Sequence, residues 1–105
     1  MSKAYLGELE APTRSELEAT RGSVLLEFGT DWCGYCLSAQ PKIAQAIAPH
    51  TQLPHFKVED GPGRALGRSY HVKLWPTLIV LLDGQEVARV VRPNESAEIA
   101  LALKG

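Results

Sequence analysis

Short apolar runs alternate along the chain with segments whose apolar residues recur at helical spacing. Four of the runs are bounded by glycine, proline or charged residues and predict strands at residues 23–28, 55–59, 77–82 and 87–91. Four other segments predict helices at residues 13–20, 32–48, 63–70 and 96–103. The dipeptide Asp83-Gly84 between the last two strands predicts a tight hairpin turn.

The order of these elements is helix, strand, helix, strand, helix, strand, strand, helix. A strand–helix–strand alternation predicts parallel strands joined by right-handed crossovers, and the final hairpin adds antiparallel pairing. We therefore expect an α/β fold with a mixed central β-sheet flanked by helices on both faces. The chain has 105 residues, enough for one core and not for two, so residues 1–105 are predicted to form a single domain.

The charged residues are nearly balanced, with 11 Lys and Arg against 12 Asp and Glu and a net charge of -1. Because no basic excess is present to neutralise phosphates, we expect no general binding to nucleic acid or to a membrane surface. The longest apolar run, at residues 78–82, is far shorter than the roughly 20 residues that a membrane-spanning helix needs. The start of the chain has no apolar signal core. These features predict a cytoplasmic protein.

The chain has two cysteines, Cys33 and Cys36, separated by two residues. Cys33 falls where the predicted strand at 23–28 leads into the helix at 32–48. Unpaired N–H groups and the helix dipole favour negative charge at a helix N-terminus, so the pKa of a cysteine there can fall to roughly 3.5–7.5. Cys36 lies one turn further on and faces inward. Position alone therefore predicts that Cys33 attacks and Cys36 resolves.

Two other interpretations of the cysteine pair compete with redox chemistry. The spacing Cys33-x2-Cys36-x13-His50-x4-His55 fits a loose two-Cys, two-His zinc pattern. A zinc finger carries both histidines on one helix, however, and the proline directly before each histidine disfavours a helix there. Two buried structural cysteines are the second alternative. A strand-to-helix junction within an α/β pattern favours the redox interpretation over both.

A longer set of residues shares one pattern: a tryptophan, the dithiol, a proline five residues after the second cysteine, and a late Pro-Thr that enters a strand. These residues are Glu27-Phe28-x-x-Asp31-Trp32-Cys33-Gly34-Tyr35-Cys36, Pro41, Trp75-Pro76-Thr77 and Gly84. The pattern resembles the thioredoxin family over residues 23–104. The resemblance implies the thioredoxin fold and dithiol–disulfide exchange.

The resemblance also implies roles around the dithiol. Cys33 would be the attacking thiolate and Cys36 the buried resolving thiol, and the proline of the Pro-Thr pair would be cis. The substrate-binding positions that the resemblance implies are Trp32, Gly34, Tyr35, Trp75 and Pro76. Trp75, the residue before the cis proline, would offer backbone hydrogen bonds to an extended segment of the substrate.

Glu27 is a carboxylate inside an apolar predicted strand. Burial raises a carboxyl pKa by disfavouring the charged form, so we expect a proton acceptor that works near neutral pH. The resemblance places Glu27 at the family's buried acid, which deprotonates the resolving cysteine, here Cys36, through water. Lys57, in the next predicted strand, matches the lysine that partners this acid. The structural alternatives are an exposed, edge-strand Glu27 and a solvent-facing Lys57.

Three positions depart from the family pattern. Tyr35 replaces the proline between the cysteines, and Cys-Gly-Tyr-Cys resembles the motif of bacterial disulfide isomerases. Trp75 replaces the small or β-branched residue usual before the cis proline, so we expect a bulkier substrate groove. Arg92-Pro93 stands where thioredoxins have a glycine that lines the same groove, and a cation there would alter docking. These departures bear on the substrate rather than on the chemistry.

These observations predict a monomeric thiol–disulfide oxidoreductase that reduces protein disulfides through Cys33 and Cys36. Its partners would be disulfide-containing proteins and a separate reductase that regenerates the dithiol. No metal or organic cofactor is needed, because the cysteines carry the electrons. Two alternatives stay open: a disulfide isomerase or oxidant, and a redox-inactive binding module whose groove docks a partner.

Overall fold

The computed structural model describes residues 4–104, which contain eight helices and strands in the predicted order. They are α1 (Arg14–Ala19), β1 (Ser23–Gly29), α2 (Gly34–Ile47), β2 (His55–Glu59), α3 (Ala65–Ser69), β3 (Thr77–Leu82), β4 (Gln85–Val91) and α4 (Ser96–Lys104). The ends of these elements lie within two residues of the predicted ends. The helix predicted at 32–48 begins later, at Gly34, because Cys33 has extended backbone angles, φ -78° and ψ 123°.

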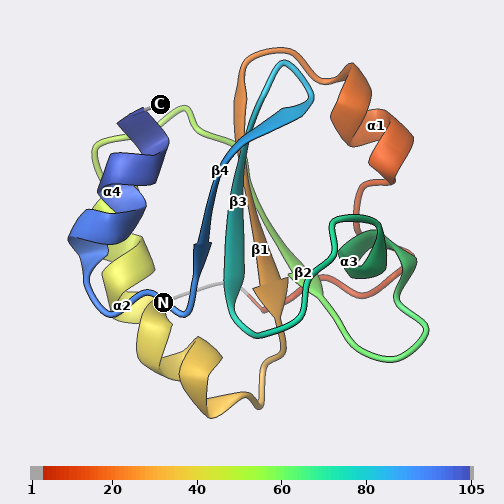
Figure 1. The fold of residues 1–105 in the computed structure, drawn as a ribbon, viewed down its shortest axis with the longest axis horizontal. Helices are drawn as coiled ribbons and strands as arrows, with labels where there is room; N and C mark the ends of the chain where they lie inside the picture. Colours follow the sequence, from red (N-terminus) through yellow and green to blue (C-terminus); the bar gives the residue numbers. More distant parts are fainter. Residues whose placement is uncertain (1–3, 105) are drawn as a thin grey trace.

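The four strands form one mixed sheet in the order β2–β1–β3–β4 (Figure 1). β1 pairs with β2 in a parallel and with β3 in an antiparallel arrangement, and the β3–β4 hairpin is antiparallel. The predicted mixed sheet is therefore confirmed. The register places Glu27 of β1 between Lys57 of β2 and Leu78 of β3, so Glu27 lies in an inner strand and not on an edge.

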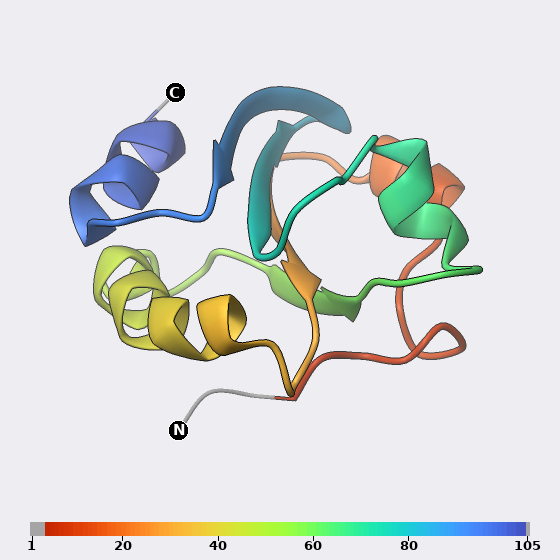
Figure 2. The same ribbon diagram turned by 60° about the horizontal axis from the view of Figure 1, so that its bottom comes forward.

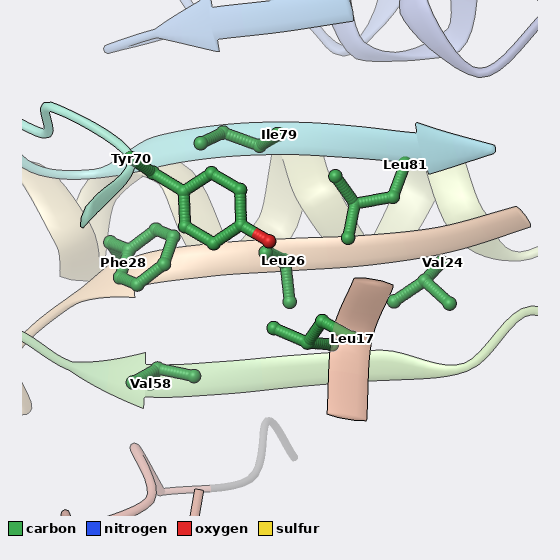
Figure 3. Close-up of a cluster of buried hydrophobic side chains, with 8 residues drawn as sticks. All are labelled: Leu17, Val24, Leu26, Phe28, Val58, Tyr70, Ile79 and Leu81. Atoms are coloured by element: carbon green, nitrogen blue, oxygen red, sulfur yellow. The ribbon is translucent and has the colours of Figure 1, made fainter. Parts of the chain in front are cut away.

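Helices cover both faces of the sheet, as predicted. α2 and α4 pack on one face, and α1 and α3 lie on the other (Figures 1 and 2). Leu17 of α1 and Tyr70, directly after α3, join the strands in the apolar cluster of Figure 3. On the opposite face, Ile43 of α2 and Ile99 of α4 pack against Leu78 and other strand residues. The sheet thus buries apolar side chains on both faces.

The alternation of side chains along β1 decides which residues meet. Val24, Leu26 and Phe28 point to the face covered by α1 and α3 (Figure 3), whereas Leu25 packs on the α2 side. Successive residues of a strand point to opposite faces, so Glu27 points to the same side as Leu25. A carboxylate is thereby placed under α2 and is fully buried.

The segment before α1 adds to the outer edge of β2, a contact that the sequence did not predict. The Leu6 N–H donates to the Lys57 carbonyl oxygen at 2.7 Å, and the Glu59 N–H donates to the Leu6 carbonyl oxygen at 2.9 Å. Leu6 and Val58 form a parallel bridge. These bonds hold the neighbouring Tyr5 against the sheet, where its side chain is buried.

α2 is the longest helix of the described residues, with 14 residues. A helix needs about 20 apolar residues to cross a bilayer, and no helix within residues 4–104 is long and apolar enough to do so. α2 continues through Pro41, although proline lacks the N–H that bonds to the residue four positions earlier. Its buried residues face the sheet and include Cys36, so the packing of α2 orients the dithiol.

Candidate dithiol site

Cys33 and Cys36 lie where β1 leads into α2, as predicted. Cys33 is the N-cap of α2, and its Sγ accepts a hydrogen bond from the Cys36 N–H at 3.3 Å. Both cysteines are free thiols, and 8% of Cys33 but 1% of Cys36 is exposed. The N–H bond and the helix dipole both favour negative charge on the Cys33 sulfur. This geometry suits Cys33 as the nucleophile.

The Cys36 thiol is held in its protonated form. Burial raises the pKa of Cys36 to about 12, and hydrogen bonding to Cys33 adds to the rise, whereas backbone hydrogen bonding from Thr30 opposes it. A thiol is a poor nucleophile until it is deprotonated. Cys36 therefore needs a base within reach of its buried sulfur before it can attack.

Aromatic side chains surround the exposed side of the dithiol. Trp32 is 74% exposed and Tyr35 is 60% exposed. The Trp75 ring lies edge-on to the Trp32 ring, with 5.9 Å between centroids, and packs against the cysteines. Gly34 is exposed at the start of α2, with open space where a side chain would be. The structure thus brings these predicted substrate-binding residues to one surface.

The Trp75–Pro76 peptide bond is cis, as the resemblance implies. The Trp75 carbonyl oxygen is already engaged, because Arg92 Nε donates to it at 2.8 Å. The Arg92 N–H also donates to the Pro76 carbonyl oxygen at 2.9 Å, and the Arg92 guanidinium lies 3.8 Å from the centroid of the Tyr35 ring. Arg92 therefore links the Tyr35 ring to the backbone of Trp75 and Pro76, and it hydrogen-bonds to the Trp75 carbonyl oxygen that was expected to bind the substrate.

Glu27 is the centre of a buried polar network behind the dithiol. Its Oε2 accepts from the Tyr5 hydroxyl and, at 2.9 Å, from Gln40 Nε2, and its Oε1 lies 2.9 Å from His55 Nε2. Burial acts to raise the pKa of this carboxyl, but hydrogen bonds from His55, Gln40 and Tyr5 outweigh burial and lower the pKa below its ordinary value. The expected rise in the Glu27 pKa is therefore wrong, and the carboxyl is held ionised.

Lys57 joins the same network through an amide. Lys57 Nζ donates to Gln40 Oε1 at 2.9 Å, and Gln40 in turn donates to Glu27. The Lys57 side chain is buried and lies 4.6 Å from the centroid of the Tyr5 ring. His55 is in direct contact with Glu27 and is a charged partner when its ring is protonated. We call these five residues, Glu27, Tyr5, Gln40, His55 and Lys57, the carboxylate network.

Three members of the carboxylate network were not predicted as site residues: Tyr5, Gln40 and His55. Gln40 lies one helical turn after Cys36, a spacing that signals a shared helix face, and its Nε2 also donates to the Cys36 carbonyl oxygen at 2.9 Å. His55 stood out in the sequence only as a zinc candidate. Tyr5 carries no local signal, because only the pairing of its segment with β2 brings it to the site.

The histidines of the zinc pattern have different surroundings. His50 is exposed in the loop after α2, whereas His55 begins β2 and contacts Glu27. Among residues 4–104, no group of three or more His, Cys, Asp or Glu side chains could hold a metal ion. His55 is thus part of the carboxylate network.

A mixed sheet between helices, a dithiol at a helix N-terminus and a cis proline beside it define a dithiol site of the thioredoxin fold. The profile of the thioredoxin family matches residues 10–105. The match covers most of the chain, and the chain belongs to the thioredoxin family.

Individual thioredoxins show the same similarity. The structure of thioredoxin 2 from Pseudomonas aeruginosa PAO1 in its reduced form has a TM-score of 0.85 and 52% identity, over 99% of this chain and 94% of that one. Thioredoxin from Chlamydia pneumoniae is 38% identical over 72 residues, 67% of this chain and 69% of that protein. TPR repeat-containing thioredoxin TDX from Arabidopsis thaliana is 31% identical over 90 residues, 86% of this chain but 23% of that protein.

These comparisons confirm the predicted family and fold. Thioredoxins are protein-disulfide reductases, and the chain is accordingly a thiol–disulfide oxidoreductase domain whose Cys33–Cys36 spacing fits a Cys-Gly-Tyr-Cys site. In general, proteins of this family act on disulfide-containing proteins and are regenerated by a reductase. The comparisons do not favour the isomerase or the redox-inactive binding module.

Proposed function

We propose that residues 1–105 work as a single, monomeric domain that reduces protein disulfides in the cytoplasm. The observation that carries this proposal is the contrast between the two sulfurs: Cys33 lies at a helix N-cap and is 8% exposed, whereas Cys36 is 1% exposed and has a raised pKa. One chain holds both cysteines, the cis proline and the buried carboxylate, so a second copy is not needed to complete the site. Both cysteines belong to one motif, which supports a location in a reducing compartment, because disulfides in such compartments are mostly transient and catalytic.

The first step is attack by the Cys33 thiolate on a substrate disulfide. A bond forms between Cys33 Sγ and one substrate sulfur, and the other substrate sulfur leaves as a thiolate. The Cys36 N–H and the α2 dipole stabilise the attacking thiolate. The product is a mixed disulfide between the protein and its substrate.

In the second step, Cys36 loses its proton and attacks Cys33 Sγ, which releases the substrate as a second thiolate. Glu27, held ionised by its hydrogen bonds, is the proton acceptor, and Lys57 supports it through Gln40. The protein is left with a Cys33–Cys36 disulfide. A separate reductase returns two electrons to it, and the cysteines need no metal or organic cofactor.

The exposed surface around Cys33 is the docking site for the substrate. The rings of Trp32 and Tyr35 are exposed and that of Trp75 is half-buried, and they offer apolar area to an extended protein segment. Gly34 leaves open space beside them, and the cis Pro76 is buried. The Arg92 side chain narrows this groove between the Tyr35 ring and the Trp75 carbonyl oxygen. Substrates are therefore expected to reach Cys33 from the Trp32 side.

Reduction of insulin by the protein, with dithiothreitol as the electron donor, tests this function. We expect Cys33→Ser to show only the slow reduction of insulin by dithiothreitol itself. Cys36→Ser, reduced beforehand and freed of dithiothreitol, should stop at a mixed disulfide with insulin that non-reducing denaturing gel electrophoresis resolves. Turnover above that slow reduction in Cys33→Ser, or a wild-type protein that binds insulin without reducing it, would indicate a redox-inactive binding module.

Alkylation of the reduced protein tests the assigned roles of the two sulfurs. Because the pKa of Cys36 is raised to about 12, Cys36 remains a thiol at about pH 8. Iodoacetamide should therefore modify Cys33 long before Cys36, as followed by mass spectrometry of peptides from the labelled protein. Equal rates of modification would contradict the assignment.

A further inference from the structure

We propose that the hydroxyl of Tyr5 relays the proton of Cys36 to Glu27 during resolution of the mixed disulfide, in the position where the family resemblance implied a water molecule. Tyr5 is thus a further catalytic residue of the dithiol site. The inference rests on the proposed function, because it describes the second step of that reaction.

The Tyr5 hydroxyl and the Cys36 sulfur both lie next to Gly29, at the end of β1, and the two residues belong to one buried cluster. A Cβ built on Gly29 would lie 2.5 Å from Cys36 Sγ and 2.8 Å from the Tyr5 hydroxyl oxygen. Any side chain at this position would collide with both groups. The glycine thus leaves room for both polar groups. Burial is the main cause that raises the pKa of Cys36, and the neighbouring Tyr5 hydroxyl acts in the opposite direction.

The same hydroxyl contacts the carboxylate on its other side. Tyr5 donates a short hydrogen bond to Glu27 Oε2. Burial, together with the neighbouring Glu27, raises the pKa of Tyr5 far above its ordinary value, so the phenol stays protonated. A hydroxyl that cannot remain ionised can still pass a proton, if it gives one to Glu27 as it receives one from Cys36.

The Tyr5 side chain is fixed in this position by contacts from several elements. The Tyr5 N–H donates to Asp31 Oδ1 at 3.1 Å, and the next residue, Leu6, is bonded to β2. Lys57 Nζ lies 4.6 Å from the centroid of the Tyr5 ring. These contacts hold the hydroxyl between donor and acceptor, which lowers the entropic cost of proton transfer compared with a mobile water molecule.

The step balances in protons, electrons and charge. The Cys36 S–H proton moves to the Tyr5 oxygen while the Tyr5 proton moves to Glu27 Oε2. The electron pair left on Cys36 Sγ forms the bond to Cys33 Sγ, and the bond between Cys33 and the substrate sulfur breaks, so the substrate leaves as a thiolate. Tyr5 is again a neutral hydroxyl, and the negative charge has moved from Glu27 to the substrate.

The proton then leaves Glu27 readily, because the pKa of this carboxyl is low. His55 Nε2 lies 2.9 Å from the other carboxylate oxygen, and the His55 side chain is 13% exposed. His55 thus connects the buried carboxylate to the protein surface, and its hydrogen bond favours the ionised form of Glu27. After this loss Glu27 is ionised again and ready for the next cycle.

The test separates the two steps with a chromogenic aromatic disulfide. Attack by Cys33 releases one coloured thiolate, and resolution by Cys36 releases a second, so stopped-flow absorbance gives both rates. We expect Tyr5→Phe to slow the second release at least about tenfold at neutral pH and to leave the first unchanged. The difference in the rate of the second release between Tyr5→Phe and the wild type should decrease as the pH rises, because hydroxide then deprotonates Cys36 directly.

Tyr70→Phe is the matched control. Tyr70 is also buried, but its hydroxyl has no hydrogen-bond partner within residues 4–104 and lies on the opposite face of the sheet (Figure 3). This variant should leave both releases unchanged. If the second release of Tyr5→Phe equals that of the wild type at every pH, the relay is wrong, while the proposed function still stands. If the wild-type protein gives no first release, the proposed function itself fails.

A measurement on the wild-type protein covers the case in which Tyr5→Phe does not fold. The relay moves two protons in one step. When the rate of the second release is measured in mixtures of H2O and D2O, its dependence on the deuterium fraction should therefore be curved, as expected when two protons are transferred together. The first release moves no proton and should change little. A straight-line dependence of the second release would mean transfer of a single proton and would overturn the relay.

Discussion

The two faces of the central sheet are built from the same strands but filled in different ways. Towards α1 and α3 the face is apolar, and its one polar side-chain atom in Figure 3, the Tyr70 hydroxyl, has no hydrogen-bond partner within residues 4–104. Towards α2 and α4, the apolar cluster around Leu25 and Ile43 ends at Glu27, where the carboxylate network begins.

This difference shows what allows a charge to be buried. Removing a carboxylate from water costs several kcal/mol unless new hydrogen bonds replace those to water. Glu27 has three such partners, from the segment before α1, from α2 and from β2. One face therefore stabilises the fold, and the other also holds a reactive group close to Cys36. Substitutions on the two faces should separate stability from chemistry.

Leu26→Ala should have the largest effect and should act on stability. Leu26 is fully buried in the apolar cluster, and the cavity left by its side chain is expected to lower the free energy of unfolding by about 2–5 kcal/mol. Urea denaturation measures this change. Leu101→Ala, at an exposed position of α4, should change stability by less than about 0.5 kcal/mol. The rate of insulin reduction per folded molecule should be the same in Leu26→Ala as in the wild type. A lower rate per folded molecule would mean that the apolar face also contributes to the chemistry.

Glu27→Gln should act on chemistry. The amide keeps the size of the side chain but cannot accept the Cys36 proton, so resolution should slow by about 10–100-fold at neutral pH, with little change in the attack by Cys33. The two releases from the chromogenic disulfide report these rates separately. Glu86→Gln, on β4 and bonded to Arg89, is the control and should leave both rates unchanged. An equal slowing of both releases would place Glu27 in the attack instead.

The stability of the protein in acid gives a further contrast. Because folding lowers the pKa of Glu27, its ionised form favours the folded state, and this contribution is complete above the ordinary pKa of 4.5 and is lost as the pH falls below it. Between about pH 5 and pH 3, the free energy of unfolding should therefore fall more steeply in the wild type than in Glu27→Gln. Denaturation midpoints measured across this range provide the test, and parallel pH curves would mean that Glu27 is not held ionised.

Arg92→Gly should have the smallest effect and should act on docking. The backbone of Arg92 has φ 49°, a left-handed conformation that glycine adopts freely, so the fold should tolerate the change. Loss of the guanidinium frees the Trp75 carbonyl oxygen for the substrate, and we expect the KM for insulin to fall roughly two- to fivefold. Arg92→Lys keeps the charge and serves as the comparison. A KM that rises in Arg92→Gly would mean that Arg92 itself binds the substrate.

Much of the fold could be predicted because it depends on local patterns. Apolar periodicity marked the strands and helices, and Asp83-Gly84 marked the hairpin, where Asp83 and Gly84 both have positive φ. The pairing of Leu6 with β2 could not be predicted in this way. A single bridge carries no periodicity, so nothing in the segment before α1 distinguishes it from a loop.

In the candidate site too, the features that depend on local patterns were predicted, and the features that depend on tertiary contacts were not. Cys33, Cys36 and Pro76 were found because a two-residue spacing and a Pro-Thr pair are short-range signals that survive in the sequence. The sign of the Glu27 pKa shift was missed, because burial alone raises the pKa of a carboxyl and only its bonds to Tyr5, Gln40 and His55 reverse that rise. Lys57 was predicted as the partner of Glu27 from the family resemblance, but its link through Gln40 was not predicted.

The sequence by itself determined the order of the elements, the α/β class and the dithiol, since each of these depends on residues close together along the chain. Only the tertiary structure decided how the buried proton is handled. Tyr5 and His55 are 22 and 28 residues from Glu27 and reach it from opposite sides in the chain. Proton transfer depends on hydrogen-bond distances between such groups, and no local pattern encodes those distances. The packing of the first segment and β2 against β1 and α2 brings them together.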